Sequence, residues 1–96
     1  MSSYFIALIT IHDQALYEEY LAGFDVVFTK FNGQVISVED KPRILEGDWP
    51  ASRTVLIKFP NEKELLQWYE SAEYQRIAKY RREASVGQIA IISGRD

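Results

Sequence analysis

Two arginines in this sequence stand where a guanidinium group is unusual. Arg53 opens an apolar run directly after a long irregular stretch, and Arg81 shares an apolar helical stripe with Ile77. A guanidinium group against apolar surface needs a carboxylate partner or an anionic ligand, because an unpaired charge is costly to desolvate. We therefore predict that Arg53 and Arg81 converge with Glu46 in one partly buried polar cluster. Whether that cluster is a structural ion pair or an anion-binding site stays open at this point.

Candidates for proton transfer are few. His12 is the single histidine and stands beside Asp13, so it is a candidate general base, with an exposed turn residue as the alternative. If the protein is an enzyme, His12 or Glu46 would move protons while the arginines hold an anionic substrate. One histidine and no cysteine supply too few ligands for a transition-metal site, and the C-terminal helix offers no axial histidine for haem. We predict neither a metal nor a cofactor.

Two aromatic residues complete the candidate site. Trp49 lies in the irregular stretch 40–52, where its ring either forms a pocket wall or anchors the loop to the body. Tyr74 either directs its hydroxyl into a cavity or packs in the core, as tyrosines at helical spacing usually do. The predicted pocket lies between helices and sheet, is walled by residues 40–52, and is lined by His12, Glu46, Trp49, Arg53, Tyr74 and Arg81.

The elements that must position these residues follow from hydrophobic spacing. Apolar or alternating runs predict strands at residues 4–11, 34–39, 53–59 and 87–93. Apolar residues spaced by threes and fours predict a helix that starts after Asp13 and reaches Phe31. Two more helical segments start at Asn61 and Ser71. Gly33, in Asn32-Gly33, is expected to end the first helix in a left-handed conformation.

This order of elements predicts one α+β domain over residues 1–96, with the ferredoxin-like βαββαβ arrangement. Right-handed crossovers place the helices on one face of a four-stranded antiparallel sheet. The strand at 4–11 is apolar on both sides, and the helices can cover only one of them. Exposing the other side would cost about 1.5–3 kcal/mol per large side chain. We therefore predict a homodimer that packs sheet against sheet.

The chain also resembles a known family. The segments LEGDWP, RTVLIKFP and WYESAEYQRIAKYRR are similar to the domain-of-unknown-function 1330 family of the dimeric α/β-barrel superfamily. The most specific matches are Glu46-Gly47, Arg53, Phe59, Trp68-Tyr69-x-Ser71-x-x-Tyr74 and Arg81. The resemblance implies a ferredoxin-like protomer and a barrel-forming homodimer, but no settled reaction. Related barrel families include cofactor-independent monooxygenases, haem-handling proteins and small-molecule isomerases. The family often has Gly-Gly where Asn32-Gly33 stands here.

Composition excludes several other classes of protein. The net charge is −3 and the isoelectric point is near 5.1, which argues against binding to nucleic acid or to an anionic membrane. No apolar run approaches the roughly 20 residues that span a bilayer, and the N-terminus lacks the order of a secretory signal. The absence of cysteine fits a reducing compartment, so we predict a cytoplasmic protein.

Three functions remain after these exclusions. The first is binding of a small, possibly anionic organic molecule in the pocket between helices and sheet. The second is a cofactor-independent enzyme, similar to a monooxygenase or an isomerase, that acts on such a molecule. The third is a non-catalytic dimeric module whose polar cluster serves stability alone.

Overall fold

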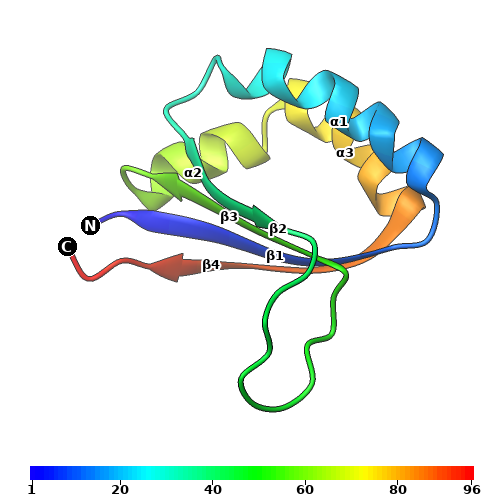
Figure 1. Cartoon of the computed structure of the whole chain (residues 1–96). Coiled ribbons are helices and arrows are strands. Elements are labelled where there is room, and N and C mark those ends of the chain that lie inside the picture. The colour runs from blue at the N-terminus through cyan, green and yellow to red at the C-terminus, as the bar shows by residue number, and fades with distance from the viewer.

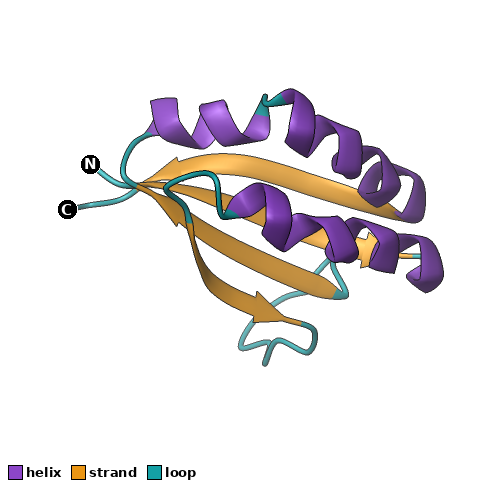
Figure 2. Ribbon diagram, turned by 90° about the horizontal axis from the view of Figure 1, so that it is seen from above, coloured by secondary structure: helices purple, strands orange, loops and turns teal.

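The four strands form one antiparallel sheet in the order β2-β3-β1-β4, and all the helices lie on one of its faces (Figures 1 and 2). The computed structural model describes residues 1–96. Its elements are β1 (Ser3–Ile11), α1 (Gln14–Phe28), β2 (Gln34–Glu39), β3 (Arg53–Phe59), α2 (Glu62–Tyr69), α3 (Ala72–Ala84) and β4 (Ser85–Ser93). This is the predicted ferredoxin-like arrangement. None of the helices has the length and apolar character needed to cross a membrane.

Each helix begins at a residue whose side chain caps it. The Asp13 carboxylate accepts a hydrogen bond from the Leu16 amide at 3.0 Å, and the Asn61 side chain accepts one from the Glu64 amide at 2.9 Å. Ser71 accepts from the amide three residues on, at 3.1 Å, and thereby starts α3 with only two residues between it and the end of α2. These caps satisfy amide donors that the first turn of a helix leaves unpaired. All three predicted helix starts are confirmed.

The end of α1 differs from the prediction. The helix stops at Phe28, so Phe31 lies in the turn that follows instead of on the helix. Gly33 does not adopt the left-handed conformation, which Gly47 alone adopts. The reason for glycine here is space: a Cβ atom at position 33 would lie 2.5 Å from the ring carbons of both Phe28 and Phe59. A close approach of two aromatic rings, and no special backbone angle, therefore requires this glycine.

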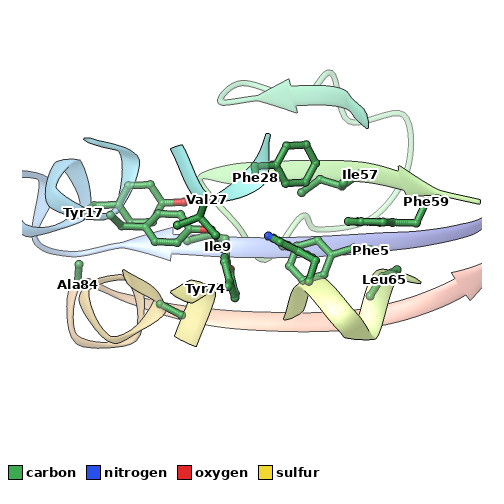
Figure 3. Packing of buried hydrophobic residues seen from close by; sticks show 14 residues of the cluster. Phe5, Ile9, Tyr17, Val27, Phe28, Ile57, Phe59, Leu65, Tyr74 and Ala84 are labelled. Atoms are coloured by element: carbon green, nitrogen blue, oxygen red, sulfur yellow. Dashed lines mark hydrogen bonds between the residues drawn. The ribbon is translucent and has the colours of Figure 1, made fainter. Parts of the chain in front are cut away.

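The helix-facing side of the sheet carries the core. Along β1 the side chains alternate, so Phe5, Ala7 and Ile9 are buried under the helices. Pairing of β1 with β3 sets Phe5 opposite Ile57 and Ile9 opposite Arg53, which places Arg53 on the same face as the core. Figure 3 shows Phe5 and Ile9 on β1 with Tyr74 nearby. The start of β4 at Ser85, two residues earlier than predicted, extends this face to the end of α3.

The other face of the sheet has no helix over it. Tyr4, Ile6 and Leu8 point to this side and remain half-exposed, as the sequence predicted. The loop of residues 40–52 projects away from the helices on the same side (Figure 1). At its tip Leu45 is 86% exposed. The chain alone therefore leaves a partly apolar sheet face and an apolar loop tip in contact with water.

The two ends of the chain are held together by a carboxylate. Asp96 accepts hydrogen bonds from the Ser2 hydroxyl at 2.7 Å and from the Ser2 amide at 3.1 Å. These bonds lie next to Ser3 and Ser93, where the pairing of β1 with β4 ends. These two bonds lower the pKa of Asp96 to about 2. Hydrogen bonds to a carboxylate favour its charged form, so the contact strengthens whenever Asp96 is ionised.

We expect this contact to make stability depend on pH below about pH 4. Because the pKa of Asp96 is lower in the folded state, its contribution is complete above the unfolded pKa and is lost as the pH falls toward 2. The melting temperature of Asp96→Asn should lie below that of the wild type at pH 6, and the difference should shrink between pH 4 and pH 2. Asp48→Asn, a change in the exposed loop, is the control. A difference that stays constant with pH would contradict the assignment.

Candidate functional site

A cavity of about 60 Å³ lies between α1 and the sheet. Its wall is mostly apolar, and β1, α1 and β3 supply six apolar residues of it: Phe5, Ala7, Ile9, Phe24, Val55 and Ile57. On the side of β2 it is bordered by Val35 and Val38, whose side chains are 40% and 44% exposed. The cavity therefore opens to solvent between α1 and this edge strand. The location between helices and sheet agrees with the prediction.

Arg81 supplies the most deeply buried charge in this wall. It lies on the last turn of α3 and is only 5% exposed. Its guanidinium carbon lies 5.9 Å from the centre of the Tyr20 ring, and its Nε and Nη2 atoms have no hydrogen-bond partner. Gly87 of β4 leaves room for Ile9 of the cavity wall, because a Cβ atom there would lie 2.9 Å from Ile9 Cδ1. The result is a cation with unused donors inside the core.

The protonation state of Arg81 follows from its neighbours. Burial lowers the pKa of Arg81, while the phenol groups of Tyr74 and Tyr20 raise it, and the net direction is upward. The guanidinium group is therefore charged at any physiological pH. No carboxylate lies among the residues of the cavity wall to balance that charge.

Arg53 is the second cation of the cavity. It is the first residue of β3 and faces the helices, with its guanidinium carbon 5.7 Å from the centre of the Tyr17 ring. One nitrogen, Nη1, donates to Asp40 at 2.9 Å, while Nε is buried and has no partner. The Asp40 side chain is 64% exposed, so solvent weakens this ion pair. Arg53 therefore also keeps a free donor inside the wall.

Two tyrosine hydroxyls lie behind the arginines. Tyr20 and Tyr74 form a buried hydrogen bond of 2.8 Å between their hydroxyl oxygens. Burial, together with the neighbouring Tyr74, raises the pKa of Tyr20 well above its ordinary value. Burial likewise raises the pKa of Tyr17, against the opposing effect of Arg53. These phenols are neutral at physiological pH, and the bonded pair retains one O–H proton that it does not use internally.

The predicted cluster forms only in part. Arg53 and Arg81 do line one cavity, but Glu46 pairs with neither of them, so the predicted ion pair is wrong. Asp40 is the carboxylate that reaches Arg53 instead. Glu46 is exposed and borders a separate groove formed by the loop itself. The loop path, which holds Glu46 away from the sheet, is the physical reason, and residues 40–52 do not wall the cavity.

The remaining predicted residues lie outside the cavity wall. His12 is exposed at the end of β1. The Trp49 indole donates a hydrogen bond to the Thr54 hydroxyl at 2.8 Å and so anchors the loop to β3. Tyr74 is fully buried and touches the site through its bond to Tyr20. Catalytic roles for His12 and Glu46 stay predictions.

Sequence reasoning did not assign the two tyrosines of the cavity wall to the site. Tyr17 and Tyr20 were assigned to the apolar stripe of α1, where their rings do lie. Their only sequence signal is that tyrosine, and not phenylalanine, occupies two neighbouring positions of a buried helix face. No group of three or more potential metal-binding side chains gathers anywhere in the structure.

The order of elements and the sheet topology define a ferredoxin-like protein. The chain belongs to the domain of unknown function 1330 family, whose family model matches residues 2–95. No curated protein matches the sequence closely. The family assignment therefore names a fold and a lineage, but no reaction.

Several solved structures are similar to this chain. A protein of unknown function from Rhodopseudomonas palustris superposes with a TM-score of 0.79 at 14% identity, over 99% of this chain and 83% of that one. SnoaB, a cofactor-independent oxygenase from Streptomyces nogalater, has a TM-score of 0.68 at 16% identity, with 99% and 94% covered. A dimeric protein of unknown function from Bacteroides fragilis has a TM-score of 0.66 at 11% identity, with 97% and 96% covered. At these identities the likeness is one of fold.

We expect Arg81→Met to leave the ligand-free protein as stable as the wild type or more stable, by about 0–3 kcal/mol. The substitution removes a buried cation whose donors are unpaired and keeps a side chain of similar length. Urea unfolding measures this difference. Arg82→Met, at the exposed neighbouring position, is the control and should change stability by less than about 0.5 kcal/mol. A loss of about 3–5 kcal/mol for Arg81→Met would instead indicate a broken buried ion pair.

Proposed function

We propose that this protein binds a small organic anion in the cavity between α1 and the sheet. One observation carries the proposal: the four buried polar atoms without a hydrogen-bond partner are all N–H donors, and three of them belong to Arg53 and Arg81. Buried donors are almost always satisfied in folded proteins, so an unused set calls for an acceptor. A carboxylate or similar oxyanion supplies acceptor atoms and the missing negative charge together.

The shape of the cavity supports an organic ligand over an inorganic ion. The walls around the guanidinium groups are apolar, with rings of Tyr17, Tyr20 and Phe24 among them. Such walls gain from contact with a hydrocarbon or aromatic body, whereas a hydrated ion gains nothing there. At about 60 Å³ the enclosed space holds the polar end of a ligand, so the rest would extend past Val35 and Val38 toward solvent.

An enzymatic function is the second candidate. SnoaB, which has the same fold, is a cofactor-independent oxygenase, and donors in a dry cavity can stabilise developing negative charge on a substrate. In that case Arg53 and Arg81 would hold the substrate, and a proton acceptor such as His12 or Glu46 would have to act from outside the wall. The third candidate is a purely structural module. It would leave the free donors of Arg53 and Arg81 without a partner.

We also propose that two copies associate through the open sheet face. Tyr4, Ile6 and Leu8 lie there without helical cover, and the exposed tip of the 40–52 loop projects on the same side. The protein from Bacteroides fragilis with this fold is dimeric, which supports the proposal. The composition favours a cytoplasmic protein that does not bind nucleic acid, as its net charge of −3 suggests.

Binding of benzoate tests the proposed ligand class. We expect benzoate, and not the neutral isostere benzamide, to raise the melting temperature of the wild type and to give a measurable affinity by isothermal titration calorimetry. Arg81→Met should weaken benzoate binding by about tenfold or more, since it removes charge-assisted hydrogen bonds. Arg82→Met should bind like the wild type. Equal binding of benzoate and benzamide, or full binding by Arg81→Met, would contradict the proposal.

Light scattering tests the association. The wild type should have the mass of a dimer at micromolar concentration, and Leu8→Glu should reduce that mass or the melting temperature because it puts a charge on the open face. Val26→Glu introduces the same charge on the exposed side of α1 and should leave the dimer intact. A monomeric wild type, or a dimeric Leu8→Glu with unchanged melting temperature, would rule out this interface.

A further inference from the structure

The charged and titratable groups around the cavity include more cations than anions. α3 contributes Arg81 and the Tyr74 phenol, and β3 contributes Arg53. α1 adds only the phenols of Tyr17 and Tyr20, while the wall residues of β1 and β2 carry no ionisable group. The single carboxylate in contact is the exposed Asp40, which is already bonded to Arg53. No carboxylate or imidazole lines the wall, so each ionisable residue in it is an arginine or a tyrosine.

We propose that this cavity holds its ligand as the deprotonated form of a weak organic acid, such as a phenol or an enol. The inference rests on the proposed function, because it concerns the same arginines. It goes further by naming a ligand class that is neutral in water at neutral pH and becomes an anion on binding. Nearby positive charge and hydrogen bonds to the charged form both shift an ionisation toward the anion.

Hydrogen bonding, like the nearby positive charge, favours the ionised form of the ligand. A neutral phenol or enol brings an O–H group that needs an acceptor. The side-chain acceptors at the wall are hydroxyl oxygens of tyrosines, and none of them is a carboxylate or an imidazole. The ionised ligand brings no donor and offers its oxygen to the free N–H groups of Arg81 and Arg53. Deprotonation therefore removes a ligand donor and supplies a charged acceptor to the arginine donors that lack one.

The flat apolar body of such a ligand also suits the site. In a phenolate or enolate the charge lies at one end of a planar carbon framework. The guanidinium groups lie over the rings of Tyr17 and Tyr20, and Phe24 supplies a further ring to the wall. Planar rings pack against such surfaces with favourable edge or stacked contacts.

The proton balance of the step is simple. The O–H bond of the ligand breaks heterolytically, its electron pair remains on the ligand oxygen, and the proton passes to solvent water. Solvent takes the proton because no side chain of the wall is a base at neutral pH. The open side between α1 and β2, at Val35 and Val38, provides the route. The bound anion is a stronger nucleophile than the neutral acid from which it forms.

The experiment uses 4-nitrophenol, whose phenolate absorbs visible light. Its ionisation is titrated from pH 5 to pH 9 in the presence of excess wild-type protein and in buffer alone. We expect the acid dissociation constant of the bound probe to rise by about tenfold or more, which is a pKa lower by about one unit or more. Arg81→Met should lose most of that shift, and Arg82→Met should retain it. Circular dichroism confirms that the variants are folded.

The wild-type titration decides the inference even if Arg81→Met fails to fold. If 4-nitrophenol binds with an unchanged or higher pKa, the inference is overturned, whereas binding of benzoate would leave the proposed function standing. If benzoate binds and 4-nitrophenol does not at millimolar concentration, the weak-acid class is wrong. If neither binds, the proposed function and this inference fail together. A lowered pKa in the wild type that Arg81→Met and Arg82→Met share equally would overturn the role of the cavity.

Discussion

A charged guanidinium group inside an apolar core is the constraint on which this structure depends. Arg81 is almost fully buried, yet two of its nitrogens have no hydrogen-bond partner. Such a group is costly unless something compensates the loss of water. The chain compensates in part, through the ring of Tyr20 beneath the guanidinium group and the neighbouring phenol of Tyr74. The remaining donors have no acceptor in the chain, which is why we assign the missing partner to a ligand.

The ferredoxin-like fold makes room for this arrangement by using the two faces of one sheet differently. The helix-facing side contains the core and, next to the edge strand β2, the cavity with Arg53 and Arg81. The opposite side carries Tyr4, Ile6 and Leu8 without cover. A small chain of 96 residues gains stability if a second copy hides that side. The proposed ligand site and the proposed interface therefore lie on opposite faces and need not compete.

Local patterns predicted most of the fold, and long-range geometry limited the prediction of the site. The strands at 34–39 and 53–59 and the caps at Asp13, Asn61 and Ser71 depend on neighbouring residues, so the sequence alone revealed them. The burial of Arg81 followed from helical spacing. The partner of Arg53 depends on the path of a thirteen-residue loop, residues 40–52, which no local pattern encodes, and Asp40 takes the position predicted for Glu46. The need for Gly33 arises from the rings of Phe28 and Phe59, which only the fold brings together, so the sequence alone attributed this glycine to backbone conformation.

A crystal structure of the protein grown with benzoate tests the role of Arg81 most directly. The carboxylate should lie in the cavity between α1 and the sheet, with its oxygens about 2.7–2.9 Å from Nε and Nη2 of Arg81. The ring should contact the apolar wall near Phe24. A structure in which a carboxylate of the protein itself occupies those two nitrogens would contradict the assignment. So would one in which benzoate binds elsewhere while the Arg81 donors remain unpaired.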